Sequence, residues 1–254
     1  MEARKVGAAN GWLWIKNGYW LFKKNPLLWM ALTAIGVTGM LGIAIIPVVG
    51  DPLATLLFPV LLAGFMFGCH ALAKGEELEL AHLFAGFRQH AQQLVTLGGI
   101  NLVGQLLILG VMMLTGGAKL VSILTGGPVD FTILLQAIAD AGLASLLGLT
   151  LFTILAMAMQ FAPMLVIFGG MQPIPALKTS LRAFIRNMIP LTVYALALLP
   201  FAIMATLPMM LGWLVLMPVT ITSMYAIYRD LFPAQEESAC SNGGEVITRN
   251  DQVP

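Results

Sequence analysis

The sequence predicts an all-α integral membrane protein with six transmembrane helices, three amphipathic interfacial helices and a three-fold parallel repeat. Composition is the first reason: 59% of the 254 residues are hydrophobic, 10% are charged, and the mean hydropathy is +0.89. Soluble globular domains carry charge on roughly a quarter of their residues. Patterning is the second reason, because the charged residues separate long uncharged runs, and a helix of about 20 apolar residues crosses a bilayer.

The uncharged runs predict six spans. They lie at about residues 27–49, 52–73, 94–115, 142–168, 190–208 and 211–231. The last two share one uncharged run from Asn187 to Tyr228, which is too long for a single span. Pro200, Pro208 and Gly212 predict a hairpin inside that run, because proline and glycine interrupt helices.

Three amphipathic segments ahead of spans predict short surface helices, which we call elbows, at about residues 10–24, 78–92 and 176–188. The third contains Phe184-Ile185-Arg186-Asn187, an aromatic residue three positions before an amide. Phe22-Lys23-Lys24-Asn25 and Phe87-Arg88-Gln89-His90 repeat that pattern in the first two. At helical spacing, apolar and polar side chains fall on opposite sides of each elbow. We therefore expect the apolar sides to face lipid and the basic sides to face water.

Five aromatic residues in and after the first elbow are typical of the headgroup layer of a membrane, where an amphipathic ring meets both lipid and water. They are Trp12, Trp14, Tyr19, Trp20 and Trp29. We expect all five at the membrane surface.

Each elbow with its two following spans forms a unit, and the second span of each unit contains a proline: Pro59, Pro163 or Pro218. The middle unit also contains an insertion, residues 116–141, in which helical spacing from Phe131 to Ile138 predicts a short interfacial helix. We expect three parallel repeats. The alternative is coincidence, because prolines are frequent in membrane helices.

The domain organisation is one membrane domain, residues 1–234, followed by a polar tail at 235–254. The tail lacks apolar periodicity, so we expect it to be disordered and cytoplasmic. Of the 13 bases, Lys119 alone falls on the side opposite the elbows. The positive-inside rule then places both termini in the cytoplasm.

Two phrases carry a resemblance to a known family: Gly11-Trp12-Leu13-Trp14-Ile15 and Leu80-Ala81-His82-Leu83-Phe84-Ala85-Gly86-Phe87. On these phrases and the prolines, the chain resembles a family of small proteobacterial multi-pass inner-membrane proteins without assigned activity. The likeness covers nearly the whole membrane region and implies a bacterial inner-membrane location. More distantly, the layout resembles the membrane region attached to some glycerophosphodiester phosphodiesterases. This chain has no hydrolase domain, so that activity is not implied.

Basic side chains on two elbows are candidate contacts for anionic lipids. They are Lys16, Lys23, Lys24, Lys178, Arg182 and Arg186. Each base near an anionic membrane surface contributes about 1 kcal/mol of attraction. The alternative is ordinary positive-inside anchoring.

Three amides inside the spans form a candidate intramembrane polar cluster: Asn101, Gln105 and Gln160. They could line a polar path, or they could hydrogen-bond between helices. The span interiors hold no Asp, Glu, Lys or Arg, which argues against a proton- or ion-coupled pump.

No metal or cofactor site is expected, because Cys69, His70, His82 and His90 lack the compact spacing of metal ligands. We expect no catalytic residues. The favoured function is a non-enzymatic inner-membrane protein that handles lipids or supports an envelope complex. A transporter or permease subunit for a small uncharged or amphipathic solute is the alternative, and a membrane-embedded enzyme is the weakest. Expected partners are membrane lipids, with a homo-oligomer or an envelope protein as further candidates and no nucleic acid.

Overall fold

The computed structural model describes residues 3–125, 130–207 and 210–233, where the regular structure is helical. The helices are α1 (Asn10–Lys24), α2 (Pro26–Ala44), α3 (Gly50–Lys74), the 3-10 helix η1 (Leu80–Phe84), α4 (Ala85–Arg88), α5 (Ala91–Leu114), α6 (Ala118–Leu124), α7 (Phe131–Asp140), α8 (Gly142–Ile167), α9 (Pro173–Arg186), α10 (Met188–Thr206) and α11 (Trp213–Leu231). The predicted all-α class is confirmed.

Within the described residues, five helices are long and apolar enough to cross a membrane: α2, α3, α5, α8 and α10. They correspond to five of the six predicted spans. Helix α11 forms where the sixth was predicted but is not among the five. It carries hydroxyl residues in its middle, including Thr222 and Ser223, and Arg229 and Asp230 in its last turn.

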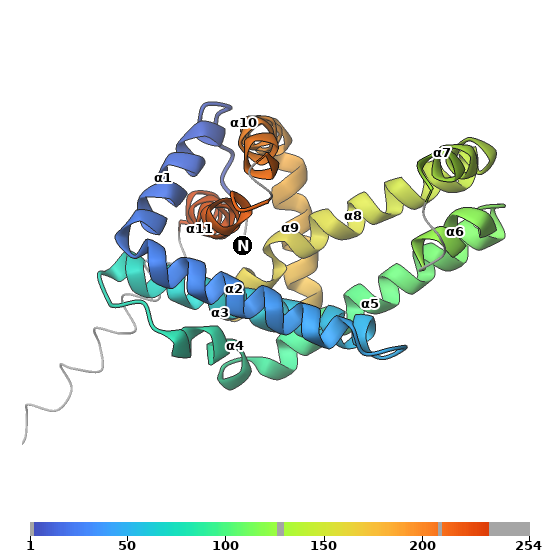
Figure 1. Cartoon of the computed structure of the whole chain (residues 1–254). Helices are drawn as coiled ribbons and strands as arrows, with labels where there is room; N and C mark the ends of the chain where they lie inside the picture. Colours follow the sequence, from blue (N-terminus) through green and yellow to red (C-terminus); the bar gives the residue numbers. More distant parts are fainter. Residues whose placement is uncertain (1–2, 126–129, 208–209, 234–254) are drawn as a thin grey trace, which may run out of the picture.

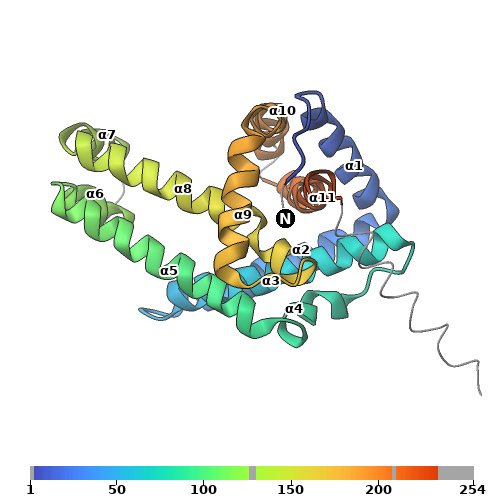
Figure 2. The ribbon, with the colours of Figure 1, turned by 180° about the vertical axis from the view of Figure 1, so that it is seen from behind.

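Three hairpins diverge from one end of the bundle, where the surface helices pack, and we call this end the base of the bundle (Figure 1). They consist of α2 with α3, α5 with α8, and α10 with α11, and the two helices of each hairpin contact one another. In Figure 1 the first hairpin runs to the right, the second to the upper right with α6 and α7 at its tip, and α10 and α11 appear nearly end-on. Figure 2 shows the same arrangement from behind.

The core lies at the base, beyond the proline of each hairpin's second helix. Buried residues concentrate from Pro59 to Leu72 in α3, from 161 to 167 around Pro163 in α8, and from Pro218 to Leu231 in α11. An internal proline removes one backbone hydrogen bond and bends a helix. The prolines therefore stand where each helix passes from the packed base toward its diverging tip.

Each surface segment packs on the second helix of another hairpin. Helix α1 lies on α11, η1 and α4 lie on α3, and α9 lies on α8. Small residues make these contacts close, as is common between membrane helices. The hydroxyl of Ser180 in α9 donates to the carbonyl of Met157 and accepts from the N–H of Phe161, both in α8 and both at 3.0 Å.

The second elbow differs from its prediction. A single amphipathic helix over 78–92 was expected, but the chain forms η1 and one turn of α4 and then breaks at Gln89 and His90, where His90 has a φ of 59°. Glu79 and His82 form a capping box that starts the 3-10 turn. The left-handed backbone of His90 ends the surface segment before α5 begins.

The other two elbows form continuous helices. The first matches its predicted range, and the third begins at Pro173, earlier than predicted, because proline suits the first helical turn. The predicted helix near 131–138 is confirmed as α7, whereas α6 was not predicted. An exposed ion pair joins these two helices, with Lys119 Nζ 3.9 Å from Asp140 Oδ2.

The expectation that all five aromatic residues lie at the membrane surface was wrong for two of them. Trp14 and Trp29 are 1% and 0% exposed, inside the protein core, whereas Trp12, Tyr19 and Trp20 are exposed. The apolar side of α1, which we expected in lipid, packs largely on protein. Helical periodicity identifies an apolar face, but it does not say what covers it.

The N-terminal segment lies in the middle of the base, between the hairpins (Figure 1). Arg4 donates its backbone N–H to the carbonyl of Leu231 at 2.9 Å. The buried side chain of Asn187 accepts from the N–H of Val6 at 3.0 Å and donates to the carbonyls of Arg4 and Ala183 at 3.1 and 3.0 Å. Asn187 thus ties the start of the chain to the third elbow. The predicted tail at 235–254, and residue 208 at the end of the fifth predicted span, lie outside the described residues.

Candidate functional site

Helix α1 organises the candidate site because side chains on its two flanks line two different cavities. Its buried strip, which includes Gly11, Trp14 and Gly18, faces α10 and α11. A cavity on one side of the strip is lined by α1, α3 and α11, and a groove on the other side is lined by α1, α10 and α11. The two spaces differ in chemistry.

The cavity toward α3 has both polar and apolar side chains in its lining and a volume of about 520 Å³, and we call it the polar cavity. The Asp230 carboxylate accepts from Asn10 Nδ2 at 2.7 Å and from Trp14 Nε1 at 2.8 Å. Hydrogen bonds to an ionised acceptor are stronger than neutral ones. Asp230 therefore holds the start of α1 against the end of α11. It also gives the indole N–H of the buried Trp14 a hydrogen-bond acceptor.

Aromatic and basic groups complete the polar cavity. Tyr225 and Arg229 line it, and the phenol of Tyr225 lies 2.9 Å from Nδ1 of His70 in α3. The guanidinium carbon of Arg229 lies 6.0 Å from the centroid of the Tyr225 ring. Hydroxyl, amide, carboxylate and guanidinium groups together suit a polar ligand group at the base of the bundle.

The groove toward α10 is apolar and has a volume of about 510 Å³. Trp12, Lys16 and Tyr19 line it from α1, and α10 and α11 supply apolar walls that include Phe201 and Val219. The rings of Trp12 and Phe201 stack with centroids 6.4 Å apart. Sequence reasoning did not foresee this groove, because α1 lies far from α10 and α11 in the chain.

The six predicted lipid contacts lie on two separate surface helices, α1 and α9. All six side chains are exposed: Lys16, Lys23, Lys24, Lys178, Arg182 and Arg186. Lys24 has protein partners, since its Nζ donates to the carbonyl of Leu72 at 2.8 Å and lies 4.3 Å from the centroid of the Trp20 ring. A positively charged side chain at this position also interacts favourably with the carbonyl groups at the C-terminal end of α3.

The three amides of the predicted polar cluster are half-buried. Gln105 lines an apolar cavity of about 580 Å³ between α5, α8 and the inserted helices α6 and α7. Asn101 and Gln160 are not among the residues that line it. The cavity therefore does not join the three amides.

Two polar contacts were missed at the sequence level, those of Asp230 and of Asn187. Asp230 carried no prediction, although it lies two residues after the uncharged run that ends at Tyr228. Its partners Asn10 and Trp14 lie more than 200 positions away.

Within the described residues, no group of three or more His, Cys, Asp or Glu side chains gathers as a metal site would require.

Comparisons with known proteins support the membrane class. The chain is 31% identical over 268 residues to a protein of Burkholderia thailandensis named as a probable inner membrane protein, covering 94% of this chain and 97% of the relative. No family model and no solved structure matches. The match supports a multi-pass inner-membrane protein, and it gives no support to the more distant resemblance to glycerophosphodiester phosphodiesterases.

Proposed function

Since the chain belongs to the family of this Burkholderia thailandensis inner-membrane protein, we propose that it is a non-enzymatic protein of the inner membrane that binds and organises phospholipids. The relative's name states a location and no activity. The proposal therefore rests on the shape and chemistry of this chain.

The divergence of the three hairpins is the observation that carries the proposal. Large apolar side chains are exposed along all three, for example Leu41, Leu107 and Leu199. A soluble monomer seldom exposes such extended apolar surface. Hairpins that diverge in a bilayer leave spaces between them that lipid chains must fill, so ordered lipids would complete the structure.

The finer architecture belongs to the same proposal. Helix α11 is the sixth span, and its Arg229 and Asp230 stand at the cytoplasmic surface, together with the elbows and both termini. Three parallel units of elbow, span and span make up the bundle. The support is that each surface segment packs on the proline-containing helix of another unit, in cyclic order around the base.

Lipid analysis of the purified protein tests the proposal. Protein extracted in mild detergent should retain phospholipid enriched in anionic species over the bulk membrane. Reversing the three bases of α9 together (Lys178→Glu, Arg182→Glu and Arg186→Glu) should reduce the enrichment, since each base contributes about 1 kcal/mol of attraction.

Lys119→Glu is the control for charge reversal, because Lys119 lies at the opposite end of the bundle in an exposed ion pair. It should leave the retained lipid unchanged. A wild-type protein without phospholipid, or with a lipid composition equal to that of the bulk membrane, would contradict the proposal.

A second candidate function is a transporter or permease subunit for a small uncharged or amphipathic solute. The cavity that contains Gln105 favours it. Gln105→Leu should then abolish solute uptake by proteoliposomes while the retained lipid stays unchanged. Support of an envelope complex, through a homo-oligomer or a protein partner, is compatible with either function.

A further inference from the structure

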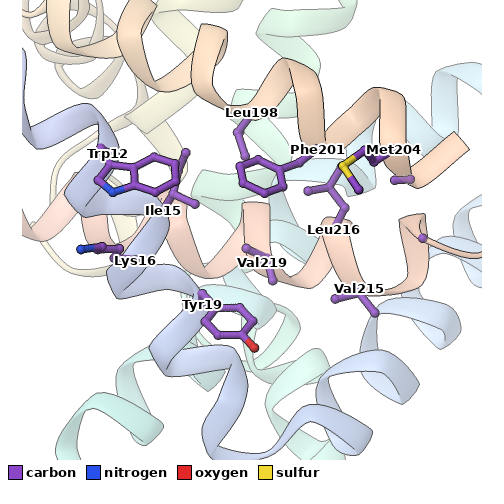
Figure 3. Close-up of a pocket in the computed structure, with 12 residues that line it drawn as sticks. Trp12, Ile15, Lys16, Tyr19, Leu198, Phe201, Met204, Val215, Leu216 and Val219 are labelled. Atoms are coloured by element: carbon purple, nitrogen blue, oxygen red, sulfur yellow. The ribbon is translucent and has the colours of Figure 1, made fainter.

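The apolar groove between α1, α10 and α11 has the form of a site for one lipid chain (Figure 3). Ile15 and Val219, both buried, lie at its floor, and Leu198 and Leu216 stand along its walls. Its volume of about 510 Å³ lies within the range of roughly 300–1,000 Å³ that small-molecule sites occupy. An apolar ligand fits this lining.

The two ends of the groove differ. At one end α10 and α11 meet: a Cβ added to Gly212 would lie 2.9 Å from the Cβ of Ala205, so no space remains between the helices there. At the other end stand Lys16 and Trp12, and Figure 3 shows both on the side away from Met204 and Leu216. The groove is therefore closed at its apolar end and charged at the other.

The groove also opens sideways. Phe201, Met204 and Val215 are 41%, 66% and 42% exposed on helices that stand in the apolar part of the bundle. Helix α10 is itself a candidate membrane span. A lipid chain could thus enter directly from the surrounding leaflet.

The positive charge of Lys16 indicates which lipid headgroup the groove would accept. The side chain of Lys16 is exposed, and it forms no ion pair or side-chain hydrogen bond within the described part of the chain. An ammonium at the end of an apolar groove suits a phosphate, and a net negative headgroup more than a zwitterionic one. Trp12 and Tyr19 beside it are amphipathic rings of the kind that lie at the headgroup level.

We propose that this groove holds one acyl chain of an anionic glycerophospholipid from the cytoplasmic leaflet, with its phosphate against Lys16. The inference rests on the proposed lipid-binding function and assigns it a site. The chain lies along Leu198, Leu216 and Val219, and its far end points toward the closed end of the groove, where Ala205 meets Gly212.

Native mass spectrometry of the full chain in mild detergent, with phosphatidylglycerol or phosphatidylcholine added, tests the site. The wild type should retain one phosphatidylglycerol, about fivefold more strongly than phosphatidylcholine. Val215→Trp fills the groove and should lower retention at least tenfold. Leu214→Trp adds the same ring at an exposed neighbour outside the groove, and retention should not change.

A second pair of variants tests the headgroup contact. Lys16→Gln should remove most of the preference for phosphatidylglycerol, while Lys74→Gln, at an exposed basic residue of α3 outside the groove and outside the six predicted lipid contacts, should keep it. If Val215→Trp fails to fold, Met204→Trp on α10 replaces it, because Met204 is more exposed than Phe201 or Val215.

The results of these experiments distinguish a failure of the proposed groove site from a failure of the proposed phospholipid-binding function. A wild type that retains phosphatidylglycerol, with undiminished retention in both groove-filling variants, would overturn the groove and leave lipid binding intact. A wild type that retains no phospholipid would overturn both. A protein dimer that is lost in Val215→Trp would identify a second copy as the occupant and overturn the proposal.

Discussion

Asn187 connects the third elbow to the N-terminal segment at the base of the bundle. Its amide is 1% exposed and bonds to Val6, Arg4 and Ala183. The sequence pattern marks Asn187 as the end of the third elbow, but it does not reveal the N-terminal segment as partner. That contact joins positions about 180 residues apart, and no local periodicity encodes it.

Asn187→Ala should lower the free energy of unfolding by about 1–3 kcal/mol, because it leaves partly buried backbone groups of the N-terminal segment without this partner. Reversible unfolding by SDS in mixed micelles measures the change.

The matched control is Asn25→Ala at the end of the first elbow. Asn25 is half-buried and forms no side-chain cap bond, so the variant should change the free energy by less than about 0.5 kcal/mol. Equal effects of the two variants would show that Asn187 does not clamp the segment.

Among the elements, α1 shows what an amphipathic pattern can and cannot predict. Its range, Asn10–Lys24, agrees with the prediction. Its environment does not, since the apolar strip packs on α10 and α11. Gly11 and Gly18 carry the signal that could have shown this, because glycines spaced along one helix face permit close approach of another helix.

Gly18→Ala should separate α1 from α11. A Cβ at this position would lie 2.6 Å from the backbone nitrogen and 2.7 Å from the Cα of Ser223, and the carbonyl of Gly18 accepts from Thr222 Oγ1 at 2.9 Å. Overpacking of this kind costs about 1–3 kcal/mol. The temperature at which half of the protein loses its monodisperse elution profile should fall.

Gly39→Ala in α2 is the control for this substitution. Apart from its chain neighbours and the backbone of its own helix, no atom lies within 4 Å of an added Cβ at Gly39, and alanine favours a helix over glycine. Its thermal stability should stay equal or rise. A Gly18→Ala protein as stable as Gly39→Ala would refute the close packing of α1 on α11.

The second elbow shows the limit of periodicity for a short element. Its apolar residues Leu80, Leu83, Phe84 and Phe87 suit a helix, and they do lie in η1 and α4. The break at His90 depends on one left-handed residue. Such a conformation leaves no trace in hydrophobic spacing.

At the scale of the whole molecule, the uncharged runs predicted most of the helices. The clustering of basic residues on the cytoplasmic side stays a prediction. The divergence of the hairpins was not predictable, because hydropathy carries no information on crossing angles. The polar cavity and the apolar groove share this limit. Each is formed by helices that only the tertiary structure brings together.

The central claim is that three hairpins cross the inner membrane from one cytoplasmic base. Labelling of single cysteines by a membrane-impermeant maleimide in spheroplasts tests it, in a background with Cys69→Ala and Cys240→Ser. Ser122→Cys in α6 and Leu211→Cys between α10 and α11 should react in intact spheroplasts. Glu77→Cys, Lys178→Cys and the native Cys240, restored alone, should react only after permeabilisation. Reaction of Cys240 from outside, or of Glu77→Cys and Lys178→Cys on different faces, would contradict the claim.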